Sequence, residues 1–214
     1  PTGAMFASGS ADRSIQLWST AEREEDSGAG AGAARTGKRR RTGAEEPRTK
    51  TPLGQLLGST APVRTIAWPE RGRLFSAGDD HCIRVWDVET ATNTGTLSSA
   101  KVINDIAVSL STNRVAAGCF DGLIRMFDPR ADASKVVTLN LKSHKRPVTT
   151  VAWSPGNANQ IVSGSQDGPG QNLKLWDVRS SNIPIHNIPG HTGKVLSVDW
   201  PTADLVVSGG EDGK

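Results

Sequence analysis

The stretch IVSGSQDGPGQNLKLWD at residues 161–177 decides the fold, because variants of it recur along the chain. Each copy holds a short β-rich run, a turn of small residues and glycine around an aspartate, and, in all but the last, a second run that closes on an aromatic residue. The other copies are FASGSADRSIQLWS (6–19), LFSAGDDHCIRVWD (74–87), RVAAGCFDGLIRMFD (114–128) and the shorter VVSGGEDGK (206–214). Such self-similarity indicates a repeat architecture.

A second motif precedes four of the copies and fixes the period. It reads PVRTIAW (62–68), VINDIAV (102–108), PVTTVAW (147–153) and KVLSVDW (194–200). The turn aspartates lie 68, 41, 46 and 45 residues apart, at Asp12, Asp80, Asp121, Asp167 and Asp212. With roughly 26 residues removed from the first gap, the period becomes about 40 to 45 residues, which is typical of propeller blades.

Each repeat predicts one four-stranded antiparallel blade. Apolar residues alternate in the second run, as at Ile83 and Val85, which is the pattern of a half-buried strand. Glycine and aspartate in the turns permit the chain to reverse. In the fourth repeat, we expect a buried, mutually hydrogen-bonded tetrad of His144, Ser163, Asp167 and Trp176. The tetrad is incomplete elsewhere, because Ser59 takes the histidine position of the second repeat and Phe127 the tryptophan position of the third.

The GH, SGSxD and LWD pattern resembles the WD40-repeat family across nearly the whole chain outside residues 21–52. More specifically, the chain is similar to the Ytm-type WD-repeat proteins at IRVWDVET (83–90), LIRMFDPR (123–130), LKLWDVRS (173–180) and KVLSVDWPTADLVVSGGEDGK (194–214). The resemblance implies an all-β WD40 β-propeller, present in part, with four to five blades of a seven-bladed ring. The chain then divides into a partial blade at 1–20, a disordered basic insertion at 21–52 and WD40 blades at 53–214, the last one incomplete.

Composition and motif content favour a binding protein over an enzyme. Six Trp and no Tyr among the 214 residues indicate a repeated structural tryptophan. Cys82 and Cys119 have no CxxC spacing and the four His are scattered, so we expect neither a metal site nor a cofactor. Ser8, Ser76 and Ser163 occupy predicted buried strand positions without a neighbouring base. The turn aspartates recur once per blade, which is structural spacing, so no catalytic site is expected.

The segment GAGAGAARTGKRRRTG (28–43) resembles a phosphate-binding loop, with Gly32 followed after four residues by Gly37 and Lys38. Arg39 stands where such a loop needs Ser or Thr, and no buried strand precedes it, so we reject nucleotide binding. The basic cluster consists of Lys38, Arg39, Arg40 and Arg41. It is a solvated charge run, a nuclear-import signal or an RNA contact, and the family resemblance favours nuclear import.

Two positions in each repeat predict a partner-binding face. The residue before each turn aspartate is expected to point toward the top of the ring, which selects Ala11, Asp79, Phe120, Gln166 and Glu211. The residue after the first apolar position of the preceding motif lies close by, which adds Arg64, Asn104, Thr149 and Leu196. The chemistry of these positions varies while the frame repeats, as in scaffolds that separate recognition from folding. Ordinary solvated loops are the alternative interpretation.

The resemblance also implies a function in ribosome assembly. It predicts a non-enzymatic interaction scaffold of a nucleolar complex required for large (60S) ribosomal subunit assembly and pre-rRNA processing, located in the nucleus, nucleolus and nucleoplasm. The implied partners are a Bop/Erb-type WD propeller protein, pescadillo and the pre-60S ribosomal particle, with indirect or weak RNA contact and no membrane. The alternative is a nucleic-acid-binding protein that contacts ribosomal RNA through the basic insertion. The resemblance does not extend to the ubiquitin-like domain that engages midasin, so that activity is not assigned.

Overall fold

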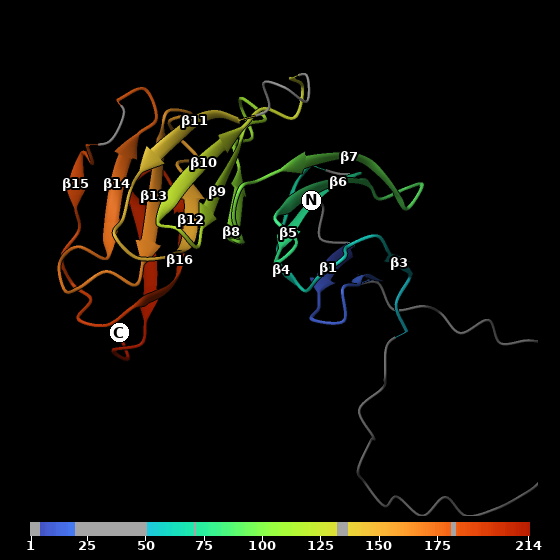
Figure 1. The fold of residues 1–214 in the computed structure, drawn as a ribbon, viewed down its shortest axis with the longest axis horizontal. Helices are drawn as coiled ribbons and strands as arrows, with labels where there is room; N and C mark the ends of the chain where they lie inside the picture. Colours follow the sequence, from blue (N-terminus) through green and yellow to red (C-terminus); the bar gives the residue numbers. More distant parts are fainter. Residues whose placement is uncertain (1–4, 20–50, 71, 132–136, 181–182) are drawn as a thin grey trace, which may run out of the picture.

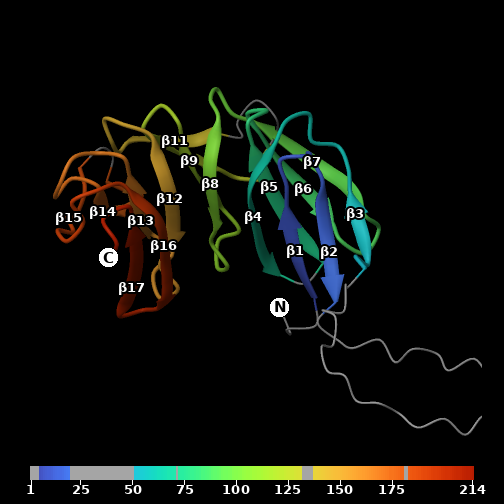
Figure 2. The same cartoon turned by 90° about the horizontal axis from the view of Figure 1, so that it is seen from below.

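The computed structural model describes residues 5–19, 51–70, 72–131, 137–180 and 183–214. The regular elements in these residues are all β-strands, and they form five antiparallel sheets. The sheets follow one another in sequence order along an arc, from blue at one end to red at the other (Figure 1, Figure 2). The predicted all-β propeller fold is confirmed, and in the described residues the arc is open.

Three of the sheets are complete four-stranded blades. The second blade consists of β4 (Val63–Glu70), β5 (Arg73–Gly78), β6 (Cys82–Asp87) and β7 (Thr92–Ser98). The third consists of β8 (Ile103–Val108), β9 (Val115–Cys119), β10 (Leu123–Phe127) and β11 (Val137–Lys142). The fourth consists of β12 (Val148–Trp153), β13 (Gln160–Ser165), β14 (Leu173–Asp177) and β15 (His186–Asn187). Each ladder joins strands that are consecutive along the chain, so every blade is a meander.

Two smaller sheets flank the complete blades, as the partial repeats predict. The first blade contains β1 (Met5–Gly9), β2 (Ile15–Ser19) and β3 (Gly54–Leu56). The last contains β16 (Val195–Thr202) and β17 (Leu205–Gly210). Leu56 of β3 pairs with Ile15 of β2, so the first blade takes strands from both sides of residues 20–50.

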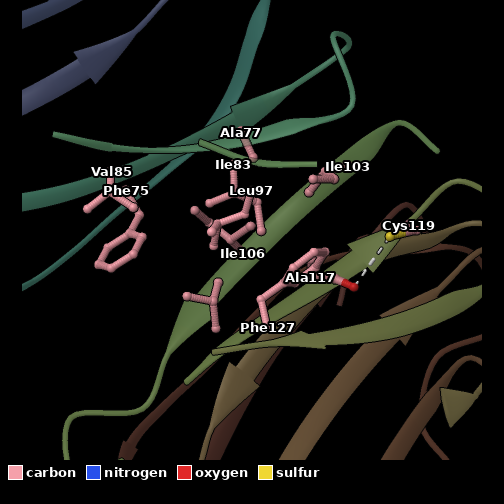
Figure 3. Packing of buried hydrophobic residues seen from close by; sticks show 11 residues of the cluster. Phe75, Ala77, Ile83, Val85, Leu97, Ile103, Ile106, Ala117, Cys119 and Phe127 are labelled. Carbon is pink, nitrogen blue, oxygen red and sulfur yellow. Dashed lines mark hydrogen bonds between the residues drawn. The ribbon is translucent and has the colours of Figure 1, made fainter. Parts of the chain in front are cut away.

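The central strands are buried on both faces, so the expected half-buried alternation is wrong. In β6, Arg84 is only 7% exposed although it lies between the buried residues Ile83 and Val85. The reason is that adjacent blades pack face to face. Figure 3 shows side chains of β5, β6 and β7 converging on those of β8, β9 and β10 in one apolar cluster.

Neighbouring blades approach closely at a recurring contact between a glycine and a valine. A Cβ atom added to Gly118 would lie 2.7 Å from Cγ1 of Val148 in the next blade. One added to Gly164 would lie 2.6 Å from Cγ1 of Val195. Both distances are far below van der Waals contact, so only glycine allows this spacing without a shift of the blades.

The predicted tetrad is present in the fourth blade. Trp176 Nε1 donates to Ser163 Oγ (2.8 Å), Ser163 Oγ lies 2.8 Å from His144 Nε2, and His144 Nδ1 lies 2.8 Å from Asp167 Oδ2. A carboxylate only accepts, so the neutral imidazole donates its Nδ1–H to Asp167 and accepts at Nε2 from the Ser163 hydroxyl, which in turn accepts from the indole. Burial lowers the pKa of His144 to about 4 against the opposing effect of Asp167, which keeps the imidazole neutral.

The second blade has no histidine in its tetrad, and an arginine of its third strand contacts the turn aspartate. Trp86 Nε1 still donates to Ser76 Oγ at 2.8 Å. Arg84 Nη1 lies 2.5 Å from Asp80 Oδ2, and both side chains are less than a tenth exposed. The turn aspartate therefore keeps a buried hydrogen-bonding partner although the preceding loop offers no imidazole.

The third blade changes two tetrad positions together. Phe127 replaces the tryptophan, and Ala117, which pairs with Arg125, stands where the fourth blade has its serine. The paired change leaves neither an indole N–H nor a hydroxyl without a partner. Arg125 Nη2 lies 2.7 Å from Asp121 Oδ2, as in the second blade.

The two partial blades keep fragments of the same network. In the last blade, His191 Nε2 lies 2.9 Å from Ser208 Oγ and Nδ1 lies 2.9 Å from Asp212 Oδ1. The hydrogen bond from His191 lowers the pKa of the Asp212 carboxyl. In the first blade, Trp18 Nε1 donates to Ser8 Oγ at 2.9 Å. Ser8 is exposed, so its predicted burial is wrong, because no described strand pairs with the free edge of β1.

Candidate partner-binding face

A β-bulge opens the first strand of every blade from the second to the fifth. The register shifts between Val63 and Thr65 in β4, Ile103 and Asp105 in β8, Val148 and Thr150 in β12, and Val195 and Ser197 in β16. The extra residue in each bulge is one that the sequence singles out: Arg64, Asn104, Thr149 and Leu196. A bulged residue has no cross-strand partner in the ladder, so its side chain does not have to follow the alternating orientation of the other side chains in the strand.

The predicted turn residues lie beside these bulges. The backbone N–H of each turn residue donates to the carbonyl of the residue that precedes the bulged strand, at 2.9–3.2 Å. The pairs are Asp79 with Pro62, Phe120 with Val102, Gln166 with Pro147 and Glu211 with Lys194. The structure therefore brings eight of the nine predicted residues together as four turn-and-bulge pairs at one end of the blades. Ala11 is exposed in the turn of the first blade, where no described strand supplies a bulge.

The four turn-and-bulge pairs differ in exposure and in charge. Arg64 forms an ion pair with Asp79, and Glu211 accepts from Lys194 Nζ at 2.9 Å. Phe120 and Leu196 are large apolar residues that remain 60% and 55% exposed. A phenylalanine at this exposure forfeits most of its burial energy unless something covers it.

Two of the bulged residues fasten neighbouring blades to one another. Asn104 Nδ2 donates to the carbonyl of Val148 at 2.7 Å, and Thr149 Oγ1 donates to the carbonyl of Val195. Both side chains are half-buried. Asn104 and Thr149 therefore have a structural role at the blade interfaces. The exposed side chains at this end are mainly Arg64, Phe120, Leu196 and Glu211.

Asp105, which directly follows the third blade's bulge, links three blades and is not among the residues singled out by the sequence. Thr65 Oγ1 donates to Oδ1 at 2.8 Å, and the Val151 N–H of the next blade donates to Oδ2 at 2.9 Å. The Ile106 N–H also donates to Oδ1 at 2.9 Å. Burial raises the pKa of Asp105 although these hydrogen bonds oppose the shift.

A signal for the bulges is present in the sequence. Apolar residues of the first strands lie three apart, as in Val63 and Ile66 or Val148 and Val151. A regular strand places residues of one face two or four apart, so a spacing of three requires one inserted residue. The position of Asp105 directly after such a residue identifies it as part of the blade interface.

Other sequence motifs do not add a second site to the described residues. The basic cluster at Lys38–Arg41 and the loop around Gly32 lie outside them. In the described ranges, no group of three or more His, Cys, Asp or Glu is placed to hold a metal ion, and both cysteines are free thiols. Nor does this part of the chain contain a helix with the length and apolar character needed to cross a membrane.

Comparisons with known proteins agree with this geometry. A family described as WD domain, G-beta repeat matches residues 1–19, 50–87, 91–128, 135–177 and 182–214. A protein named ribosome biogenesis protein WDR12 homolog in Nematostella vectensis is 38% identical over 99% of this chain and 50% of the relative. Its namesake in Trichoplax adhaerens is 37% identical over 96% of this chain and 47% of the relative. The namesake in Oryza sativa is 35% identical over 100% and 49%. The chain spans about half the length of these relatives.

Proposed function

Because the chain belongs to the WD40-repeat family, we propose that it is a non-enzymatic interaction scaffold in ribosome biogenesis. Its activity is the assembly of the large (60S) ribosomal subunit, including pre-rRNA processing, within a nucleolar complex. The names of relatives that match nearly the whole chain support the role in ribosome biogenesis. Its location is the nucleus, nucleolus and nucleoplasm, and its partners are a Bop/Erb-type WD propeller protein, pescadillo and the pre-60S particle.

The observation that carries the scaffold role is the constancy of the frame beneath variable side chains. The same backbone hydrogen bond and the same bulge recur in four blades. The side chains at these positions differ from blade to blade. They are the ion pair of Arg64 and Asp79, the amide and ring of Asn104 and Phe120, the uncharged polar groups of Thr149 and Gln166, and the apolar and acidic side chains of Leu196 and Glu211. A rigid repeated frame with such variation is suited to recognising proteins, because the exposed positions differ from blade to blade while the backbone frame stays the same.

The test is the double variant Phe120→Ala with Arg64→Glu in the full-length protein. Both side chains are exposed, so we expect the melting temperature to change little. Binding to the Bop/Erb-type protein or to pescadillo, measured by calorimetry, should weaken by about tenfold or more if these residues anchor the interface. A folded double variant with unchanged affinity for both partners would place the interface on another face.

A second function, RNA contact through Lys38–Arg41, is favoured by four consecutive basic residues. Phosphate contacts make affinity fall steeply with salt. Replacing the four residues by alanine should then remove salt-dependent binding to ribosomal RNA.

A nuclear-import role of the same four residues predicts a different result. A tagged variant with all four replaced by alanine should shift toward the cytoplasm while its melting temperature is unchanged. Unchanged nuclear accumulation, with import on a bound partner excluded, would contradict it.

A further inference from the structure

Phe120 projects from the described surface between two basic loops. On one side, its N–H donates to the Val102 carbonyl at 3.0 Å, which places the turn against Lys101 and Val102. On the other side, the Gly122 carbonyl accepts from the His144 N–H at 3.0 Å. A Cβ on Gly122 would lie 3.0 Å from the Arg146 carbonyl oxygen. The Phe120 turn is therefore held between Lys101 and the loop that carries Arg146.

The two loops that hold the Phe120 turn carry three cations that have no counterion among the described side chains. Lys101, Lys145 and Arg146 are all exposed, and none of them takes part in the ion pairs found there. The backbone N–H groups of Lys145 and Arg146 both donate to the Asp167 carboxylate, at 3.0–3.4 Å. Their backbone is thus fixed by the buried tetrad while their side chains remain free.

The basic surface is short, because acidic residues flank it on both sides. Toward the second blade lies Asp79, already paired with Arg64. Toward the fifth blade lies Glu211, already paired with Lys194. Gln166, the turn residue beside the Lys145 loop, is uncharged. The Phe120 patch, defined as Lys101, Phe120, Lys145 and Arg146, therefore spans only the third blade and the loop into the fourth.

From this arrangement we infer that the Phe120 patch binds an acidic peptide segment that carries an apolar side chain. The inference rests on the proposed scaffold function and specifies the chemistry of one partner. The apolar side chain of the segment covers the 60% exposed ring of Phe120, and its carboxylates neutralise the three unpaired cations. Because the backbone of the loop is fixed before binding, the conformational entropy lost there is confined to the side chains that meet the carboxylates.

The extent of the patch favours a peptide over single-stranded RNA. Proteins that bind single strands use a basic groove along the backbone and several aromatic rings on which successive bases stack. Here one ring stands alone within the patch, and the cations on either side, Arg64 and Lys194, are already paired with carboxylates. A short acidic segment with one apolar anchor fits this area, whereas a longer polyanion gains no unpaired cation from Arg64 or Lys194.

The inference is tested by fluorescence anisotropy with the full-length protein. The probe is a labelled peptide in which glutamates flank a single leucine. One matched peptide replaces the leucine by alanine, a second replaces the glutamates by glutamine, and an oligouridine RNA is the competing polyanion. The variants are Phe120→Ala, Phe120→Leu and the double variant Lys145→Glu with Arg146→Glu. Arg114→Glu, an exposed cation at the other end of the same blade, is the control.

We expect the glutamate-leucine peptide to bind, and the double charge reversal to weaken it by about tenfold or more. Phe120→Ala should remove the preference for leucine over alanine, Phe120→Leu should restore it, and Arg114→Glu should change neither. Melting temperatures of all variants verify folding. Absence of peptide binding, equal loss in Arg114→Glu, or tighter binding of the RNA to the same residues would each overturn the inference.

A separate readout distinguishes this inference from the proposed function. If the peptide does not bind but the full-length protein still sediments with pre-60S particles, the Phe120 patch is wrongly assigned and the scaffold role stands. If the peptide binds as expected but the protein does not associate with ribosome precursors, the patch stands and the proposed function is wrong.

Discussion

Ser163 joins the two halves of the buried tetrad, because its hydroxyl contacts both Trp176 and His144. A single hydroxyl can accept from the indole and donate to the imidazole at the same time. The third blade shows that the aromatic ring tolerates replacement when the serine changes with it, at Phe127 and Ala117. The contribution of each tetrad residue to stability therefore depends on which polar groups its replacement would leave without a hydrogen-bonding partner.

Truncating Trp176 tests this dependence. Trp176→Ala removes a ring that is 1% exposed, so the free energy of unfolding should fall by about 3 to 5 kcal/mol. Trp176→Phe keeps most of the apolar volume, and Ser163 keeps its bond to His144, so the loss should be about 1 to 2 kcal/mol. Urea denaturation of the full-length protein measures both. Equal losses in the two variants would contradict the importance of the buried volume.

The neutral state of His144 predicts a dependence of stability on pH. The pKa is about 4 in the folded protein and 6.5 in the unfolded chain, so the unfolded chain binds the extra proton between these values. The contribution of His144 is complete above the unfolded pKa and is lost as the pH falls from 6.5 to 4, by about 3 kcal/mol. His144→Gln should remove this part of the pH dependence. His186→Gln, at an exposed histidine, should leave it in place, and identical profiles for wild type and His144→Gln would contradict the assignment.

At the scale of single elements, the turns between the second and third strands are set by local backbone geometry. Gly122 has a φ of +80°, and a Cβ there would lie 2.4 Å from the His144 carbonyl oxygen. Gly170 has a similar φ of +72° but no heavy atom within 4 Å of the added Cβ. A side chain at Gly170 would therefore meet backbone strain alone, whereas a side chain at Gly122 would meet both backbone strain and steric overlap.

Alanine at each of these glycines gives the matching prediction. Gly170→Ala should lower the free energy of unfolding by about 1 to 2 kcal/mol, the cost of a left-handed backbone. Gly122→Ala should cost about 1 to 3 kcal/mol more, because the loop of His144 must move. Thermal denaturation monitored by circular dichroism compares them. If Gly170→Ala were the more damaging variant, the close approach at Gly122 would not limit the turn.

The elements could be predicted from the sequence to the extent that they repeat. The turn aspartates and the strand runs recur with a similar spacing, and the tetrad around His144 follows from the residue types at the repeated positions of the fourth blade, so pattern alone predicts them correctly. The burial of Arg84 was not, because it depends on the adjacent blade and on the pairing with Asp80, which no local pattern records. The bulges leave a trace in the three-residue spacing of Val63 and Ile66. The bulged residues are among the predicted partner-binding residues. The hydrogen bonds by which Asn104 and Thr149 join neighbouring blades are not predicted, because they depend on the position of the next blade.

At the scale of the whole molecule, hydrogen bonds join the first strands of neighbouring blades next to the turn-and-bulge pairs. Asp105 accepts from Thr65 of the preceding blade and from the Val151 N–H of the following one. Thr150 continues the series by accepting from the Val198 N–H at 3.2 Å. The side chains that make these bonds lie one residue past the bulges. The bonds therefore fix both the spacing of the blades and the spacing of the exposed bulge residues.

Removing the Asp105 carboxylate should therefore affect more than one blade. Asp105→Ala leaves the Thr65 hydroxyl and two backbone N–H groups without an acceptor, so we expect a loss on the order of 3 kcal/mol. Thr65→Val, which leaves the carboxylate its two backbone donors, should cost about 1 kcal/mol. Hydrogen exchange gives the decisive measurement, because the Val151 amide should lose protection in Asp105→Ala and keep it in Thr65→Val. Unchanged protection at Val151 would mean that the Asp105 carboxylate does not couple the blades.

The meander connectivity of the blades has a consequence for how the protein is made. Every ladder joins strands that follow one another along the chain, so a blade needs only the most recent stretch of about 40 residues to complete its hydrogen bonds. Translation adds residues far more slowly than a hairpin closes. Each blade can therefore finish pairing its strands while the next is still inside the ribosomal exit tunnel. The contacts between blades, among them the hydrogen bonds of Asp105, form only when the neighbouring blade has emerged.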